Sequence, residues 1–534
     1  MALKKAMLGT LIGLALGAAS TAQASDIDHV LLLSIDGLHA LDVARYVESH
    51  PGSALARLAQ HGVTYSDART PANSDSFPGV LALVTGGSPL SHGFFYDVSY
   101  DRTLFAPDNT SCSGPAGNMM VYDESIDNYS AAGISLDTIN PAALPRALRD
   151  GRCVPIFPHQ GMRANTIFEV AREHGKHTAW ADKHPAYDLV NGPSGSGVED
   201  LFTPEITNAP PTGSGPDATT SVLCTVANDA LKVEGVINQI HGRRHDGTPW
   251  HGTPGVFGMN FQAVSVGQKL AKDAGNSACP SLAYPAGMSL TGQAGGYLDG
   301  DGTPSAVLRY GLAHTDAAIG RMIDELKKVG QYERTLIIVT AKHGQSPINL
   351  VKVNKPGHFA DLVAALPGAA ADPAAQAIVS AANCSGGPCG FVQDDDVALI
   401  WLQDQGQTAA VARYLNANAK ALFIDEVMAG AELKLKFRDP AHDSRTPDLI
   451  VQPQYGTIYT ASTKKNAEHG GFSYGDTNVG LVVSHPRLEA RTVKSPVSTS
   501  QLAPTILRAL DIDPDELTAV RQEETRVLPG LPNL

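Results

Sequence analysis

The sequence predicts an α/β protein built on a doubly wound, mostly parallel sheet with helices on both faces. Two short apolar runs, His29 to Asp36 and Thr335 to Ala341, are typical of strands buried on both faces, as in parallel sheets. Segments with helical periodicity alternate with such runs, and this alternation favours helices packed over a parallel sheet. Further strands are expected at 63–65, 178–181 and 479–484, and helices at 54–61, 166–174, 303–329 and 500–510.

The chain length and the loosely patterned segments predict insertions into this sheet. With 534 residues, the chain exceeds the usual size of a single core, so one large domain with insertions or two domains are expected. Residues 193–302 are rich in Gly, Pro, Ser and Thr and are predicted to form an insertion over the sheet. Residues 351–440 are predicted to form a small α/β subdomain, after which the main sheet should resume at 447–451.

The first 24 residues have the pattern of a secretory signal peptide. Lys4 and Lys5 precede an apolar stretch, and Ala22-Gln23-Ala24 forms a small-x-small cleavage site, so cleavage after Ala24 and a periplasmic or secreted location are expected. No later segment offers the ~20 uninterrupted apolar residues of a membrane span. The formal charge of −14, spread without long runs, argues against a nucleic-acid surface.

Six cysteines in an exported chain predict disulfides. We expect the cysteines to pair with their sequence neighbours, which gives Cys112 with Cys153, Cys224 with Cys279, and Cys384 with Cys389.

Ser76 lies in a stretch, Thr70 to Gly79, that leads into an apolar run. Pro78 indicates a helix start, and Ser76 stands where a side-chain oxygen caps a helix. An isolated serine of this kind is most simply a cap. A helix N-terminus also attracts anions, so a hydroxyl at this place is positioned to attack a phosphorus or sulfur centre.

Four residues, Asp36, Ser76, His343 and His469, fall at strand ends or in loops that a doubly wound sheet gathers at one edge. One carboxylate, one hydroxyl and two imidazoles form a plausible donor set for a divalent ion such as zinc. Such an ion lowers the pKa of a bound hydroxyl and screens the charge of an ester. The four positions therefore predict a metal-dependent hydrolytic site.

The motifs at these positions resemble those of the alkaline phosphatase superfamily, and within it the type I phosphodiesterase/nucleotide pyrophosphatase branch. The resemblance spans nearly the whole mature chain, with the motifs in the expected order. They are Ser34-Ile-Asp36-Gly37, Ser76-Phe-Pro78 with Val84-Thr-Gly86, Pro89-Leu-Ser91-His92-Gly93, Thr340-Ala-Lys-His343-Gly344 and Glu468-His469-Gly470.

The resemblance implies an alkaline phosphatase-like fold and a hydrolase of phosphate esters. It implies that Asp36 and His343 bind a divalent metal ion, that His469 belongs to a second ion, and that Ser76 is a metal-bound nucleophile. A covalent phospho-enzyme would form on Ser76. The implied cofactor is one or two ions, with Zn²⁺ preferred, and the implied partner is a small-molecule phosphate ester.

Three positions depart from the family pattern. Lys342 stands where the family has aspartate, which makes it a candidate catalytic cation near the place of a lost ion. The resemblance implies that Asp299 is a metal ligand, with Asp301 competing for the same role, but Thr303 replaces the histidine that follows in the family. Asp97 occupies the approximate place of a substrate-binding asparagine. Asp97, Asp182 and His184 are candidates for substitute metal ligands, and the last two follow a predicted strand.

Two alternatives stay open at this point. A single-metal site beside a lysine also resembles sulfatases, which favours sulfate-ester or phosphonate hydrolysis, although Ser76-Phe-Pro78-Gly79-Val80 lacks the arginine of the sulfatase motif. The other alternative is a binding or scaffold protein that retains the fold without turnover.

Overall fold

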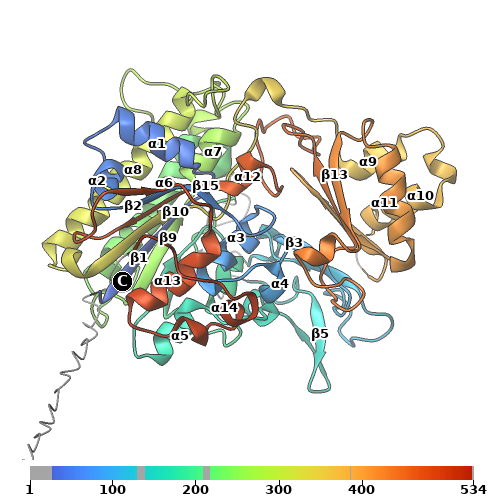
Figure 1. The fold of residues 1–534 in the computed structure, drawn as a ribbon, viewed down its shortest axis with the longest axis horizontal. Helices are drawn as coiled ribbons and strands as arrows, with labels where there is room; N and C mark the ends of the chain where they lie inside the picture. Colours follow the sequence, from blue (N-terminus) through green and yellow to red (C-terminus); the bar gives the residue numbers. More distant parts are fainter. Residues whose placement is uncertain (1–26, 129–138, 208–216, 385–386, 532–534) are drawn as a thin grey trace, which may run out of the picture.

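The computed structural model describes residues 27–128, 139–207, 217–384 and 387–531 (Figure 1). The predicted signal peptide therefore lies outside the described residues. The fold consists of a large sheet covered by helices and a second, smaller sheet to one side of it (Figure 1).

The large sheet confirms the predicted, mostly parallel architecture. Its nine strands are, in spatial order, β16 (Arg491–Val493), β2 (Gly62–Arg69), β15 (Asn478–Ser484), β10 (Thr335–Thr340), β1 (His29–Ile35), β9 (Val256–Phe261), β7 (Ala179–Ala181) and β8 (Asp200–Phe202), with β17 (Val497–Ser498) also paired to β2. Strand β1 pairs in parallel with β10 and β9, and β7 pairs in parallel with β9 and β8. Strand β15 runs antiparallel to both β10 and β2, so it is the reversed strand within the sheet.

Helices cover both faces of this sheet (Figure 1). One face carries α1 (Ala40–Ser49), α2 (Ala54–Gln60), α6 (Val222–Ile240), α7 (Ala263–Lys269) and α8 (Ala306–Lys328). The other carries α3 (Ser76–Thr85), α4 (Pro89–His92), α5 (Ile167–Glu173), α13 (Leu502–Ala509) and α14 (Thr518–Glu523). The strands β1 and β10 are fully buried between these layers, which explains their unbroken apolar sequences.

Residues 193–302 correct the sequence prediction in part. Strands β8 and β9 and helices α6 and α7 come from this segment, and β9 lies between β1 and β7 in the main sheet. The segment is therefore not simply an insertion over the sheet. Its strand Val256–Phe261 includes Gly258 and follows a loop rich in Gly and Pro, and this composition concealed a buried strand.

The second sheet is entirely antiparallel. Its strands are, in order, β11 (Gly390–Asp394), β12 (Ala398–Leu402), β14 (Leu449–Pro453) and β13 (Ile424–Ala429), and its helices are α9 (Phe359–Ala364), α10 (Pro373–Ala382) and α11 (Thr408–Ala417). The prediction that 447–451 rejoins the main sheet is wrong, because β14 pairs with β12 and β13. A buried apolar strand has the same sequence pattern in either sheet, so the pattern alone does not identify its neighbours.

Two hairpins, β3 (Val98–Asp101) with β4 (Asn118–Val121) and β5 (Arg146–Arg149) with β6 (Arg152–Pro155), and the short helix α12 (Tyr474–Thr477) complete the described helices and strands. The three predicted disulfides are confirmed, and they pair Cys112 with Cys153, Cys224 with Cys279 and Cys384 with Cys389. Within the described ranges, no helix combines the length and apolar character that crossing a membrane requires.

Candidate active site

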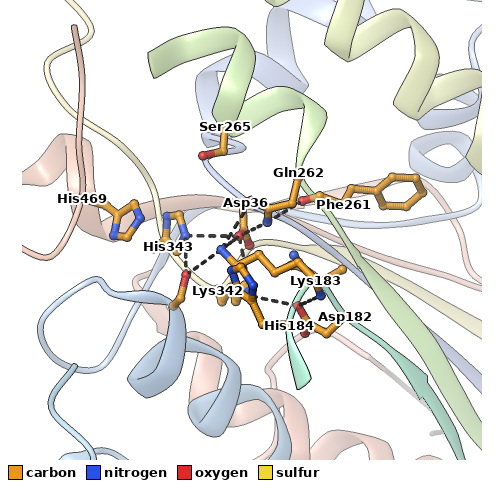
Figure 2. Close-up of polar contacts among 12 residues, drawn as sticks. Asp36, Asp182, Lys183, His184, Phe261, Gln262, Ser265, Lys342, His343 and His469 are labelled. Atoms are coloured by element: carbon orange, nitrogen blue, oxygen red, sulfur yellow. Dashed lines mark hydrogen bonds and ion pairs between the residues drawn. The ribbon is translucent and has the colours of Figure 1, made fainter. Parts of the chain in front are cut away.

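The topology of the main sheet brings the predicted residues to one edge. Asp36 follows β1, and Lys342 and His343 follow β10, at the carboxyl ends of adjacent parallel strands. Because β15 runs in the opposite direction, the segment that precedes it, with His469, reaches the same edge. Figure 2 shows Asp36 at the centre of this group, with the two histidines on one side and two lysines on the other.

Ser76 is the first residue of α3, and its hydroxyl is not the helix cap. Asp75 is the N-cap, and its carboxylate accepts a hydrogen bond from the backbone N–H of Phe77 at 3.2 Å. The Ser76 hydroxyl is thereby left to face the site, where Oγ lies 3.3 Å from Nε2 of His343. Helix α3 approaches the loop after β10 closely at Gly79, where a Cβ would lie 2.0 Å from the carbonyl oxygen of Lys342.

Hydrogen-bond donors and cations surround one oxygen, Oδ2, of the fully buried Asp36. Gln262, directly after β9, donates its amide to this oxygen, while Nζ of Lys183 lies 3.4 Å away and Nζ of Lys342 lies 3.6 Å away. Nε2 of His343 is 3.5 Å from the same oxygen. Burial alone would raise the pKa of the Asp36 carboxyl, but the ammonium groups of Lys342 and Lys183 hold that pKa well below its usual range.

Lys342 is fully buried behind Asp36. Its ammonium group lies 3.4 Å from Oδ1 of Asp182, donates to the hydroxyl of Tyr187 at 2.5 Å, and lies 4.1 Å from the centre of that tyrosine ring. Burial lowers the pKa of Lys342, and the charges of Asp182 and Asp36 oppose that shift. The sequence predicts Lys342 as a catalytic cation. In the structure its ammonium group contacts Asp36, Asp182 and Tyr187, so a direct contact with substrate stays a prediction.

Lys183 was not among the predicted catalytic or metal-binding residues, yet it contacts the nucleophile candidate directly. It follows β7, and its Nζ lies 3.3 Å from Oγ of Ser76 and 3.4 Å from Oε1 of Gln262. Burial would lower the pKa of Lys183, but Asp36 and two other carboxylates outweigh it, so that the pKa is raised. The sequence offered one indication of this role, which is that Lys183 follows a predicted strand.

His343 and His469 lie face to face, with ring centres 3.8 Å apart. Nδ1 of His343 lies 2.8 Å from the carbonyl oxygen of Gly344, so this nitrogen carries the proton and Nε2 presents a lone pair to Ser76. Nδ1 of His469 lies 3.3 Å from Oδ1 of Asp75. Burial holds the pKa of His469 well below its usual range, which favours a neutral ring.

The fit of this site to the divalent ions that the resemblance implies is poor. Two donor spacings, 3.3 Å from Ser76 Oγ to His343 Nε2 and 3.5 Å from that nitrogen to Asp36 Oδ2, are close to the roughly 3.3 Å between ligands of a tetrahedral zinc ion. Nζ of Lys183, however, lies within 3.4 Å of both oxygens. A dication roughly 3.5 Å from one ammonium group would be repelled by ~9 kcal/mol at an effective dielectric constant of about 20.

The donors for a second ion are also incomplete. Asp299, predicted as a ligand, is exposed and accepts hydrogen bonds from the backbone of Asp301 and Thr303 within its own turn, and its role as a ligand stays a prediction. Within the described ranges, the His, Cys, Asp and Glu cluster whose donor atoms converge within 4.8 Å is Asp127, His184 and Glu205, and it does not include Asp36 or His343.

The other candidate ligands are engaged elsewhere. His184 pairs with Glu205 at 2.8 Å, and Asp182 accepts from the indole N–H of Trp180 at 3.0 Å. Asp97 accepts from the backbone N–H of Val98 at 2.8 Å, and its predicted contact with substrate stays a prediction.

A pocket of about 600 Å³ opens beside the site. Lys183 and Gln262 form part of its wall, so the groups that touch Asp36 and Ser76 also face this space. The remaining wall includes Lys269, Lys272, Lys464 and Lys465. Glu468 pairs with Lys269 at 2.9 Å and also with Lys465, whereas Lys272 and Lys464 have no ion-pair partner in the described part of the chain. The pocket is therefore suited to an anionic ligand.

Similarity to known proteins agrees with these features. The sequence matches the family model "Type I phosphodiesterase / nucleotide pyrophosphatase" over residues 30–228 and 292–476. No curated protein shows significant sequence similarity to the chain.

Solved structures with the same fold are distant in sequence. Murine ectonucleotide pyrophosphatase/phosphodiesterase 5 superposes with a TM-score of 0.50 at 14% identity, covering 91% of this chain and 95% of the murine one. An inactive variant of the murine protein in complex with AMP gives the same values. The alkaline phosphatase PafA superposes with a TM-score of 0.57 at 12% identity, covering 93% of this chain and 97% of PafA. The chain shares the fold of the alkaline phosphatase PafA, belongs to the type I phosphodiesterase/nucleotide pyrophosphatase family, and is a phosphoric ester hydrolase.

Proposed function

We propose that this exported chain hydrolyses small phosphate esters, with diesters of nucleotide type as the preferred class, through Ser76 as nucleophile. The observation that carries the proposal is the position of Oγ of Ser76, 3.3 Å from Nε2 of His343 and 3.3 Å from Nζ of Lys183. A hydroxyl between a base and a cation is suited to attack phosphorus and to form a phosphoryl-serine intermediate.

The adjoining pocket supports an anionic substrate of nucleotide size. Its volume of about 600 Å³ lies within the usual range for small-molecule sites, and several lysines line it. The murine relative that binds AMP has the same fold, which makes a nucleotide ester the first class to test. The proposal includes no zinc ion, because the donor set around Asp36 is opposed by two ammonium groups.

The experiment measures turnover of bis-p-nitrophenyl phosphate, a nucleotide p-nitrophenyl ester and p-nitrophenyl sulfate by the purified mature chain. We expect turnover of the phosphate esters, loss of at least ~100-fold in Ser76→Ala, and a phosphoryl group on Ser76 detected by mass spectrometry after acid quenching. Preference for the sulfate ester would support the sulfatase-like alternative. No turnover of any ester would favour the binding or scaffold alternative.

A further inference from the structure

The centre of the site has the opposite polarity to a metal centre. In a metal site, several acceptor atoms converge on a cation. Here, the amide of Gln262 and the ammonium groups of Lys183 and Lys342 converge on one anionic oxygen, Oδ2 of Asp36. Figure 2 shows these three side chains reaching Asp36 from different elements. The ammonium groups that converge on this oxygen oppose the binding of a divalent ion to it.

The two ammonium groups also balance the buried carboxylates. Asp36 and Asp182 are both fully buried, and Lys342 lies within 3.6 Å of each. Lys183 adds the second positive charge, 3.4 Å from Asp36. A dication added at Asp36 would therefore lie close to both ammonium groups, whose charge already offsets that of Asp36 and Asp182.

We propose that the reaction of this site proceeds without a divalent ion: Lys183 takes the place of the ion beside Ser76, Lys342 positions Asp36 from behind, and Nε2 of His343 is the base for Ser76. The proposal rests on the function proposed above and assigns roles within the same site. Lys183 is the catalytic cation because its side chain touches Ser76 and lines the pocket, whereas Lys342 is a positioning residue.

The chemical step balances with water as the only co-reactant. The proton of the Ser76 hydroxyl moves to Nε2 of His343 as Oγ forms a bond to phosphorus, and the bond from phosphorus to the leaving oxygen breaks. The leaving oxygen, in line with and opposite Oγ, takes a proton from water. In the second half, the resulting hydroxide bonds to phosphorus from that opposite side, while the bond to Oγ breaks and Oγ takes back its proton from Nε2 of His343. Lys183 screens the charge on the phosphoryl oxygens in both halves.

The first test is the metal content of the purified mature chain, measured by elemental analysis together with Asp36→Asn and Glu205→Gln. Glu205 belongs to the separate cluster with His184 and Asp127, so its variant reveals an ion bound there instead. We expect that Asp36→Asn removes no ion from the protein. One ion per chain that is lost in Asp36→Asn and retained in Glu205→Gln would overturn the proposal.

The second test is the response to zinc and to EDTA. We expect EDTA to change phosphate-ester turnover less than twofold, and zinc to leave the melting temperature of Glu205→Gln, which lacks a ligand of the separate cluster, unchanged. Combining Lys183→Ala with Lys342→Asp removes both cations and supplies a carboxylate, so zinc should raise the melting temperature of this variant. Turnover that EDTA abolishes and zinc restores would refute the metal-free site but not the hydrolase. Absence of Ser76-dependent turnover would refute the proposed function, while the metal analysis would still decide the occupancy of the site.

The third test separates the roles of the two lysines. Lys183→Met should lower kcat by at least ~100-fold, because it removes a group that stabilises charge in the transition state. Lys183→Arg keeps the positive charge and should restore part of the lost kcat. Lys420→Met, an exposed lysine outside the main sheet, is the matched control and should not change kcat. A kcat for folded Lys183→Met within threefold of the natural value would contradict the role of Lys183.

Discussion

The buried ammonium group of Lys342 makes a strong prediction about stability. Lys342→Met leaves Asp36 and Asp182 buried with only Lys183 nearby to offset their charge. Removing one partner of a buried ion pair costs ~3–5 kcal/mol. At an unfolding entropy of ~2.1 cal/mol/K per residue, about 500 residues give an entropy of ~1 kcal/mol/K, so the melting temperature should fall by ~3–5 °C.

The assay is thermal unfolding by circular dichroism at pH 7, with a double variant as the control. Lys342→Met combined with Asp182→Asn removes one cation and one carboxylate together, so it should recover much of the lost stability. A loss below ~1 kcal/mol in the single variant, with no recovery in the double variant, would refute the charge balance argued for this site.

The pH dependence of the same variant follows from Asp36. Because the folded-state pKa of Asp36 is held well below its usual value, its stabilising contribution is complete above the unfolded pKa of ~3.9 and is lost as the pH falls toward the folded value. Without Lys342 the folded-state pKa is less depressed. Acid unfolding of Lys342→Met should therefore begin at a higher pH than in the natural chain, and equal acid midpoints would contradict this.

Two more predictions test the packing and the buried imidazoles. Gly79→Ala should push α3 away from Lys342 and lower stability by ~1–3 kcal/mol together with turnover, as overpacking does, whereas the matched Gly52→Ala, where no atom lies within 4 Å of the new Cβ, should change neither. Burial lowers the pKa of His92 to about 3, so the folded state binds fewer protons than the unfolded chain below pH ~6.5, and stability should fall by ~2 kcal/mol between pH 6.5 and pH 5. Denaturant titrations at both pH values check this, and His92→Gln should remove the dependence.

The sequence was sufficient to predict the elements that bury apolar residues on both faces. Strands β1 and β10 and helix α8 lie close to their predicted bounds, because long apolar runs and a 3.6-residue stripe have few competing structures. Strand β9 was missed because Gly258 and the preceding loop weaken its pattern. The pairing of β14 was wrong because burial identifies a strand but not its neighbours.

The site shows the same limit at the level of single residues. The topology placed Asp36, Ser76, His343 and His469 at one edge, as their positions after or before strands predicted. Gln262 went unnoticed because its strand was missed, and Asp299 was chosen because a motif was matched in sequence without the sheet that positions it. Strand order, which a single sequence does not contain, decides which polar residues meet.

The contacts of Asp36 show how Lys342, Lys183 and Gln262 depend on one another. Lysine at 342 alone would add a positive charge close to any ion bound to Asp36, and so would weaken the binding of that ion. When no ion binds, the buried carboxylates need other cations and hydrogen-bond donors, and Lys183 and Gln262 supply them to Asp36. Each change therefore makes the others favourable, whereas a return to aspartate at 342 alone would bring a third carboxylate against Asp36 and Asp182. Restoring a metal site in this chain should accordingly require the simultaneous exchange of Lys183 and Lys342, and neither exchange alone should be sufficient.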